Sequence, residues 1–396
     1  MISSLVVSFF ALGSCPQGAA AQVLEPTRAR VTRQDFAEVV QDVDAAFTNG
    51  RRLPAAGGRS ALAATNLAFD AITMTFFSLQ LVRAFEELVA LREELGDPDA
   101  GLFGSRAPDQ KEGDGSSGEL QGATLRQALL ARLEKLGEGV PEDAARALRQ
   151  RLKLRWDAPS KVRSAEFLIE PVSYEASLLA EMVSLERGED PYALRRGDHW
   201  RTFIHGRRGL ATRVFFPGAA AESAMPLVVA FHGAGGDENF LFEVAGQGRI
   251  KTLAERHGAL VVAPFTIDFM SSKKAFESLL AGIKADYDFD ESRVFVVGHS
   301  MGAMTVAKLC QWAPERLAAA ACIAGFTEQE FGPIPPIHVI SGELDSIVPF
   351  AGVKSAAEAA ASAGAPVRFT AMKDQGHTLL LPAALDLVFA DWFPPN

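Results

Sequence analysis

A serine lies between two glycines at the point where the sequence changes from a strand-like to a helical pattern. The apolar, β-branched run Val294–Val297 leads into Gly298-His-Ser300-Met-Gly302, and a helical pattern begins at Met301. A serine hydroxyl is a weak nucleophile unless a tight turn exposes it beside a base, and glycines permit such a turn. The helix also directs unpaired backbone N–H groups toward negative charge at the serine. The pattern predicts a nucleophile elbow; the alternative is a glycine-rich turn with a capping serine.

Two further residues have the types and positions that a serine nucleophile needs. His377 follows the strand-like segment Val367–Met372, and its imidazole can act as the base. Asp345 follows the segment Ile337–Ile340, and its carboxylate can orient that imidazole. Parallel strands end at one edge of a sheet, so both side chains are expected to meet Ser300 there. The chain order serine, aspartate, histidine is also one in which such triads occur.

Other residues compete for the acid and base roles. Glu343 lies nearer the strand end than Asp345, and Asp374 shares the loop of the histidine. His299 adjoins the serine, but as its neighbour at the strand end it is expected to point its ring away. The remaining histidines are expected on the surface or in the core: His199, His205, His257 and His338.

A glycine-rich loop offers donors for a developing oxyanion. Its sequence, from Phe231, is Phe-His-Gly-Ala-Gly-Gly-Asp, and it follows the strand-like segment Leu227–Phe231. Ala234, with Gly233 as the alternative, is expected to form an oxyanion hole together with the backbone N–H of Met301. A phosphate-binding loop is the rival function, but the sequence lacks both G-x-x-x-x-G-K-[ST] and G-x-G-x-x-G.

These segments need a scaffold that brings several strand ends together. From about Trp200 onward, strand-like and helical segments alternate at βαβ spacing, which predicts a mostly parallel sheet with helices on both faces. Strands are expected at Thr212–Phe216, Leu227–Phe231, Leu260–Ala263, Val294–Val297, Ala319–Ile323, Ile337–Ile340 and Val367–Met372. Helices are expected to start near Glu238, Lys274, Met301 and Phe350, with a last one from about Ala383 to Trp392.

The first half of the chain is helical in pattern and carries no group of residues assignable to chemistry. Apolar residues recur at helical spacing over Asp35–Phe47, Ser60–Leu95, Leu125–Leu136, Glu142–Leu154 and Val172–Arg187. We expect an all-α domain over residues 25–190, arranged as an up-and-down bundle. A stretch at 107–122, rich in Gly, Ser and acidic residues, is expected to be a flexible loop, and a catalytic domain is expected over 198–396.

Composition limits the partners. A net charge of −10 argues against nucleic acid, because phosphate binding needs a basic surface. The sequence has no C-x-x-C pair and no histidine cluster at ligand spacing, so a metal site is not expected. Cys310 and Cys322 are expected to be free, buried thiols.

The N-terminus resembles a secretion signal. Residues 1–22 contain an apolar core, Leu5–Leu12, and small residues at Ala19-Ala-Ala-Gln22 that suit cleavage. They predict a secreted or periplasmic protein; a lipoprotein signal at Cys15 is the alternative, which Pro16 disfavours. The apolar core is too short to span a membrane, and no other candidate span occurs.

Four motifs together resemble the α/β-hydrolase superfamily, close to its esterases, polyhydroxybutyrate depolymerases and feruloyl esterases. They are Val228-Val-Ala-Phe-His-Gly-Ala-Gly-Gly236, Gly298-His-Ser-Met-Gly302, Asp345-Ser-Ile-Val-Pro349 and Gly376-His377. The resemblance covers about residues 200–396. It implies Ser300 as nucleophile, Asp345 as acid, His377 as base and a backbone oxyanion hole. It also implies hydrolysis of a small-molecule or polymeric ester through an acyl-enzyme, without a cofactor.

Two other functions stay open on the sequence. A peptidase or amidase can use the same triad and oxyanion hole, and a non-catalytic binding protein can share the scaffold. The intact set of serine, aspartate and histidine disfavours the second.

Access to the site depends on loops and on the helical half. Many lipases of the superfamily carry a lid after the sixth strand, but Gly325–Ile334 is too short for one. The helices of the first half either form an independent module that binds a partner or cover the active site. The stretch at 107–122 favours the first role, because it is expected to be a flexible connection within that half. Phe265, Phe269 and Phe326 lie in loops at the active edge and either line an acyl or aromatic pocket or belong to the core.

Overall fold

The computed structural model describes residues 31, 33–96, 127–134, 142–152, 171–192, 195–218, 224–327 and 332–394. Residues 31–396 form one compact unit. The expected signal at 1–22 and the expected loop at 107–122 lie outside the described residues. Within the described ranges, no helix is long and apolar enough to cross a membrane.

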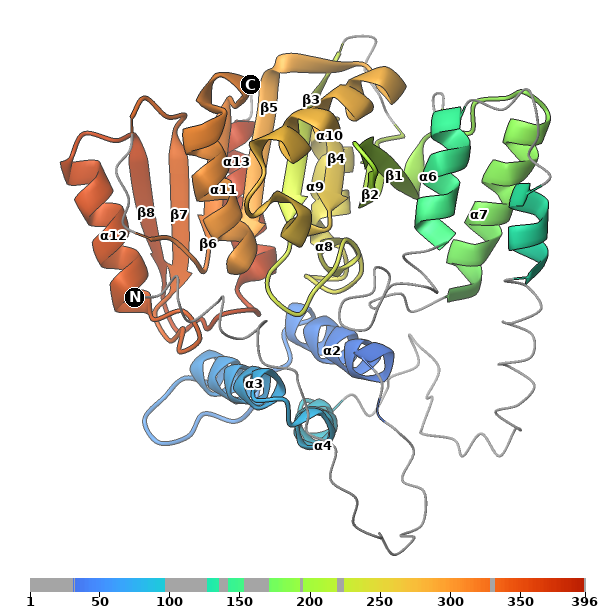
Figure 1. The fold of residues 1–396 in the computed structure, drawn as a ribbon. Helices are drawn as coiled ribbons and strands as arrows, with labels where there is room; N and C mark the ends of the chain where they lie inside the picture. The colour runs from blue at the N-terminus through green and yellow to red at the C-terminus, as the bar shows by residue number, and fades with distance from the viewer. Residues whose placement is uncertain are drawn as a thin grey trace, which may run out of the picture. The chain divides into compact units, whose positions relative to one another are not determined.

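An eight-stranded sheet forms the centre of this unit (Figure 1). Its order is β1-β2-β4-β3-β5-β6-β7-β8. β2 pairs antiparallel with β1 and with β4, and every other neighbouring pair is parallel, as the sequence predicts. The strands are β1 (Gly197–His205), β2 (Arg208–Phe216), β3 (Met225–Phe231), β4 (Leu260–Pro264), β5 (Phe289–His299), β6 (Ala319–Ile323), β7 (Ile337–Gly342) and β8 (Val367–Met372).

Helices cover both faces of the sheet, because its central strands are apolar on both sides. Every residue of β3 is buried; Leu227, Val229 and Phe231 join one core, whereas Val228 and Ala230 join the other. The first core contains α10 (Lys273–Asp286), α11 (Met301–Trp312) and α12 (Phe350–Ser362). The second contains α8 (Phe240–Glu243), α9 (Arg249–His257) and α13 (Leu381–Trp392). Cys310 and Cys322 are free and buried, as expected.

The described helices before β1 form two groups, not the single bundle expected. α2 (Arg33–Thr48), α3 (Ala61–Phe77) and α4 (Leu81–Glu94) share a core that includes Val244 and Leu379 of the sheet region. Residues 127–134, α6 (Glu142–Leu152) and α7 (Pro171–Glu186) share another core, against which Trp200 of β1 packs. Figure 1 shows α6 and α7 beside β1, and α2–α4 apart from them. The division into domains at 25–190 and 198–396 stays a prediction.

The long helical pattern over Ser60–Leu95 is two helices, so that part of the prediction is wrong. Leu79 takes a left-handed backbone conformation (φ 62°) and separates α3 from α4. Side chains other than glycine rarely adopt this conformation, and the segment between the two helices contains neither glycine nor proline. Nothing in the local sequence therefore marks the break.

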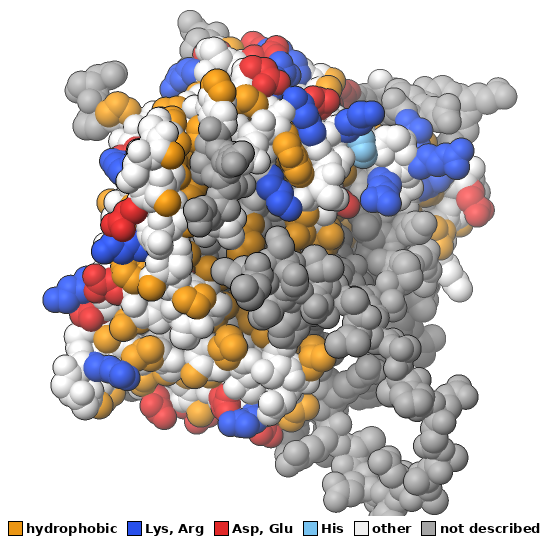
Figure 2. Space-filling model, turned by 60° about the vertical axis from the view of Figure 1, so that its left-hand side comes forward, with side chains coloured by type: hydrophobic (Ala, Val, Ile, Leu, Met, Phe, Trp, Pro, Cys, Tyr) orange, Lys and Arg blue, Asp and Glu red, His pale blue; other side chains and the backbone are white. Residues whose placement is uncertain are grey.

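Charged side chains on the surface are mixed in sign. On the face shown in Figure 2, acidic and basic side chains lie next to one another at the upper, left and lower edges. This mixture fits the modest net charge of −10.

Candidate active site

Ser300 lies on a sharp turn between β5 and α11. Its backbone has φ 55° and ψ −115°, a conformation that is strained for a residue with a side chain, and its N–H donates to the Ile323 carbonyl at 2.8 Å. Glycine is required on both sides. A Cβ at Gly298 would lie 2.2 Å from the Gly302 carbonyl oxygen, and one at Gly302 would lie 2.2 Å from the Phe231 carbonyl oxygen. The turn therefore has the geometry of the predicted elbow.

Asp345 and His377 meet at the same edge of the sheet. The His377 Nδ1–H donates to Asp345 Oδ2 at 2.8 Å, and both side chains are almost fully buried. The other carboxylate oxygen, Oδ1, accepts backbone N–H groups from Ile347 (3.0 Å) and Val348 (2.9 Å). Since Nδ1 is the donor in this pair, Nε2 of the imidazole is left to act as a base.

The loops that carry the acid and the base are themselves joined. The Leu344 N–H donates to the Gln375 carbonyl at 2.9 Å. At the end of β7, a Cβ on Gly342 would lie 2.4 Å from the carbonyl oxygens of Gln375 and Gly376. Only glycine allows the histidine loop to approach this strand so closely.

The rival acids and bases lie in other environments. Glu343 is exposed, and Asp374 Oδ2 accepts a hydrogen bond from the Ser60 hydroxyl at 3.0 Å. Four histidines have partners away from Ser300: His199 pairs with Tyr287, His205 with Ser278, His257 stacks on Phe393 and His338 pairs with Thr370. The triad of Ser300, Asp345 and His377 therefore stays the prediction that fits the geometry.

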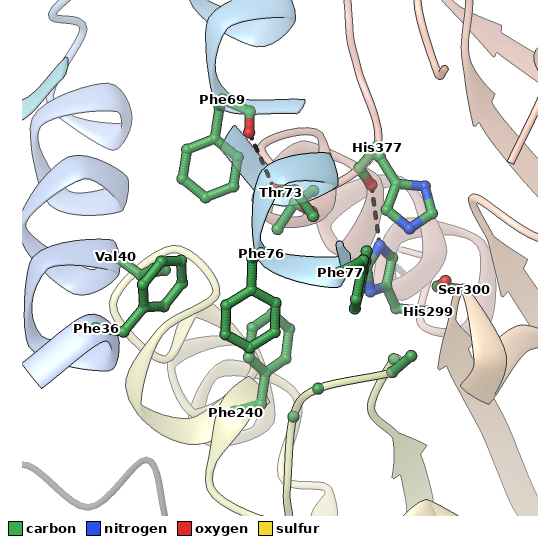
Figure 3. A pocket seen from close by; sticks show the side chains of 15 residues that line it. Phe36, Val40, Phe69, Thr73, Phe76, Phe77, Phe240, His299, Ser300 and His377 are labelled. Atoms are coloured by element: carbon green, nitrogen blue, oxygen red, sulfur yellow. Dashed lines mark hydrogen bonds between the residues drawn. The ribbon is translucent and has the colours of Figure 1, made fainter. Parts of the chain in front are cut away.

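His299 corrects one expectation, because its ring does not point away from the site. It borders the same cavity as Ser300 and His377, with its ring centroid 4.8 Å from that of His377. Its Nε2–H donates to the backbone carbonyl of His377 at 2.9 Å, a contact drawn in Figure 3. Burial, helped by the nearby His377, lowers the pKa of His299 to about 3, so this ring stays neutral beside the base.

The glycine-rich loop after β3 packs directly against the serine. A Cβ on Gly233 would lie 3.2 Å from Ser300 Cβ. His232 fixes the loop: its Nδ1–H donates to the Gly233 carbonyl at 2.8 Å, and its Nε2 accepts the Thr266 N–H at 3.0 Å. Burial lowers the pKa of His232 to about 4, which keeps it in this neutral form. The loop from Gly233 to Gly236 borders the cavity, where Ala234 is the predicted donor.

Comparison with known proteins finds partial matches among solved structures only. No family model matches the sequence, and no curated protein matches it. A thermostable esterase is 24% identical, with a TM-score of 0.42 and a match covering 50% of this chain and 62% of its own. This chain therefore matches less than two thirds of that esterase's length.

Two further matches have similar values. The fluorophosphonate-binding serine hydrolase F of Staphylococcus aureus is 12% identical (TM-score 0.43; 50% of this chain, 100% of its own). A feruloyl esterase module from Clostridium thermocellum is 14% identical (TM-score 0.42; 51% of this chain, 89% of its own).

The strand order decides the fold. An order of 1-2-4-3-5-6-7-8 with the second strand antiparallel, and a Gly-x-Ser-x-Gly turn after the fifth, is the α/β-hydrolase arrangement. The chain has the α/β-hydrolase fold. In such open sheets the ligand site lies at the carboxyl ends of the strands, which is where Ser300, Asp345 and His377 are found.

Helix α3 contributes to the candidate site in a way that the sequence did not predict. The Asp70 carboxylate accepts the backbone N–H of His377, with distances of 3.1 and 2.9 Å to its two oxygens. The Asn66 Oδ1 accepts the backbone N–H of Gly376 at 2.8 Å. These partners lie more than 300 residues apart in the sequence, and no local pattern announces their contact.

A cavity beside Ser300 is lined mainly by aromatic side chains (Figure 3). Its volume is about 70 Å³, which is more than a single water molecule needs. The aromatic side chains are Phe36 of α2, Phe69, Phe76 and Phe77 of α3, and Phe240 of α8. The only hydroxyl on the helical walls, that of Thr73, donates to the Phe69 carbonyl at 3.0 Å, and no charged side chain is among the described lining residues.

The three phenylalanines proposed from the sequence do not line this cavity. Phe269 and Phe326 are buried in the core beneath the sheet, and Phe265 packs against the His232 ring with a centroid distance of 5.4 Å. Within the described residues, no group of three or more His, Cys, Asp and Glu side chains could hold a metal ion.

Proposed function

We propose that this protein is a serine hydrolase that cleaves carboxylic esters, with Ser300, His377 and Asp345 as its triad. The observation that carries the proposal is the 2.8 Å hydrogen bond from His377 to Asp345, with His377 and Ser300 bordering one cavity. A strained serine turn with an imidazole whose Nδ1 proton is already engaged is what nucleophilic catalysis needs.

The reaction follows from these positions. His377 Nε2 takes the proton of the Ser300 hydroxyl as the oxygen attacks the ester carbonyl. The N–H groups of Ala234 and Met301 bind the resulting oxyanion. His377 then gives its proton to the departing alkoxide, which leaves an acyl-serine. Water, deprotonated by the same imidazole, attacks the acyl-serine. The imidazolium then returns that proton to the departing Ser300 oxygen, which releases the acid and the free enzyme.

The lining of the cavity bears on the substrate. A charged group would lose much of its hydration there and gain little in return, because the described lining residues include no Lys, Arg, Asp or Glu. We therefore expect an ester whose group next to the scissile bond is neutral and compact. We also expect an ester that bears a carboxylate at that position to be hydrolysed poorly.

Covalent labelling tests the proposal. A fluorophosphonate should modify wild-type protein at Ser300, as located by mass spectrometry of the peptides. Ser300→Ala should abolish both labelling and ester hydrolysis, whereas Ser362→Ala, at the exposed end of α12, should change neither. Hydrolysis by folded Ser300→Ala at the wild-type rate would contradict the assignment. Faster turnover of an anilide than of the matched ester would favour the amidase alternative.

A further inference from the structure

The N-cap of α3 and two side chains of the helix contact three residues of the loop that carries the proposed base. Ser60, the N-cap of α3, donates its hydroxyl to Asp374 Oδ2 at 3.0 Å. Asn66 and Asp70 follow on the same face of α3, four residues apart, and accept the N–H groups of Gly376 and His377. α3 therefore runs along the histidine loop and contacts its backbone at successive turns.

These contacts are buried and specific. Asn66 and Asp70 expose 0% and 1% of their surface, so their hydrogen bonds are shielded from water. The Asn66 Nδ2 donates to the Leu62 carbonyl at 3.0 Å, which directs Oδ1 toward Gly376. A Cβ on Gly376 would lie 2.5 Å from Asp70 Oδ2, so only glycine lets the loop approach this carboxyl so closely.

A buried carboxyl is costly unless its oxygens are satisfied. Burial is the main reason that the pKa of Asp70 is raised to about 7, while the positive potential and the N–H of His377 lower it in part. Whether or not the carboxyl is protonated, it keeps an oxygen that accepts the His377 N–H. The hydrophobic core that α2–α4 share also holds α3 beside the histidine loop, since Leu379 belongs to that core together with Phe69 and Ile72 of α3.

The remaining polar atoms of His377 are held from other directions. Its carbonyl accepts the His299 Nε2–H at 2.9 Å, and its Nδ1–H donates to Asp345 at 2.8 Å. With Asp70 on its backbone N–H, every polar atom of the residue except Nε2 has a partner. The imidazole is therefore fixed in position and in tautomer, with Nε2 directed to the reaction.

We propose that α3 positions the base of the hydrolase, with Asp70 as the positioning residue and Asn66 as its support. The proposal rests on the proposed function of His377. In this proposal, a helix outside the α/β-hydrolase sheet holds the main chain of His377, while Asp345 holds the His377 ring. Neither residue touches the reacting atoms; both act through His377.

Steady-state kinetics of three α3 variants test the proposal on the full chain. In Asp70→Ala the His377 N–H loses its acceptor, and misalignment of the base should lower kcat on the order of 10²-fold. KM for a short neutral ester should stay near that of the wild type, because the cavity walls are unchanged. Asp70→Asn keeps an acceptor oxygen and should recover most of kcat. Thr75→Ala, on the same helix, removes a hydroxyl that donates to the Ala71 carbonyl of that helix and should behave as the wild type.

Asn66→Ala is the second probe, because it removes the Gly376 acceptor without removing a charge and leaves Asp70 in place. It should lower kcat with little change in KM. Unchanged kcat in folded Asp70→Ala and Asn66→Ala would overturn the inference, as would equal losses in Asp70→Ala and Asp70→Asn. The rate of fluorophosphonate labelling of Ser300 should fall in parallel with kcat. Failure of the wild type to label would instead contradict the proposed function, so the two failures are distinguishable.

Discussion

Ser300 is held in its strained conformation by the glycines on either side. Gly302 lies inside α11, where glycine is ordinarily unfavourable, yet a methyl group there would collide with the Phe231 carbonyl oxygen. The close approach of β3, β5 and α11 at this point is what places the serine at the edge of the sheet. The cost of a helical glycine is therefore offset by the geometry of the elbow.

Gly302→Ala should lower both stability and activity. We expect a loss of about 1–3 kcal/mol in the free energy of unfolding, because the added methyl overpacks the turn. Fluorophosphonate labelling of Ser300 should slow as the elbow shifts. Gly352→Ala in α12 is the control: its Cβ meets nothing within 4 Å, so the free energy of unfolding should stay equal or rise by up to about 1 kcal/mol. Similar melting temperatures for the two variants would contradict this account.

The acid can be identified by exchanging single carboxylates. Asp345→Asn keeps the size of the side chain but cannot hold His377 in the required tautomer, so kcat should fall on the order of 10⁴-fold. Glu343→Gln, two residues earlier and exposed, should leave kcat nearly unchanged. Ester hydrolysis at saturating substrate measures both. Loss of activity in Glu343→Gln, with Asp345→Asn still active, would show that Glu343 is the acid.

Among the elements, seven of the eight strands of the sheet were predicted from the sequence. β6 has the predicted bounds, because a short apolar run between turn signals is characteristic of a buried parallel strand. β8 also has the predicted bounds, although it is an edge strand with no fully buried residue. β1 and α9 were missed because polar and charged residues interrupt their patterns: β1 is an edge strand, and α9 is a short helix rich in basic residues. Hydrophobic periodicity reports burial along one element, and it is weak where an element is half exposed.

The contribution of α3 to the site could not have been predicted from the sequence. Its aromatic residues look like an ordinary core stripe, and its Asp70 looks like a surface carboxylate, until the fold brings them to His377. Likewise, the sequence offered loop phenylalanines for the pocket, but Phe269 and Phe326 are core residues and the pocket rings come from helices. Contacts between distant segments depend on tertiary packing, which local patterns do not record.

Helix α3 is expected to influence substrate selection. The Phe76 ring packs on Phe36 with a centroid distance of 4.7 Å, and its edge would lie 3.2 Å from a Cβ on Gly235 in the glycine-rich loop after β3. Phe76→Ala removes this wall, so kcat/KM for ethyl butyrate, whose longer acyl chain would contact it, should fall by about tenfold relative to ethyl acetate. Met74→Ala, on the exposed side of the same helix, should leave the ratio unchanged. Competition between the two esters measures the ratio of their kcat/KM values. The same ratio in the wild type and in both variants would show that α3 does not determine substrate selection.

At the scale of the whole compact unit, α2 joins the group of helices α2–α4 to the sheet region. The Gln41 Nε2 donates to the Glu243 carbonyl at 2.7 Å, and Asp44 Oδ2 accepts the Gln247 N–H at 3.1 Å. Val244 completes the core of α2–α4 between these two contacts. We therefore expect α2–α4 and the sheet to unfold together, because separating them would expose this shared core to water.

Asp44 makes this junction sensitive to pH. Burial raises its pKa to about 7, although the backbone N–H groups of Gln247 and Gly246 lower it in part. In the unfolded chain an aspartate titrates near its ordinary pKa of about 4. Between these two values the folded state keeps a proton that the unfolded state has lost, so raising the pH destabilises the folded state.

Asp44→Asn removes this titration and keeps an acceptor for the Gln247 N–H. The free energy of unfolding of the wild type minus that of Asp44→Asn should fall by up to about 1.4 kcal/mol per pH unit as the pH rises from about 4 to about 7, and then level off. Urea unfolding at several pH values measures this difference, in which the titration of the buried histidines cancels. Thr75→Ala changes no titratable group, so its difference from the wild type should not vary with pH. A difference for Asp44→Asn that is equally flat, or that grows with pH, would show that Asp44 does not hold its proton in the folded protein.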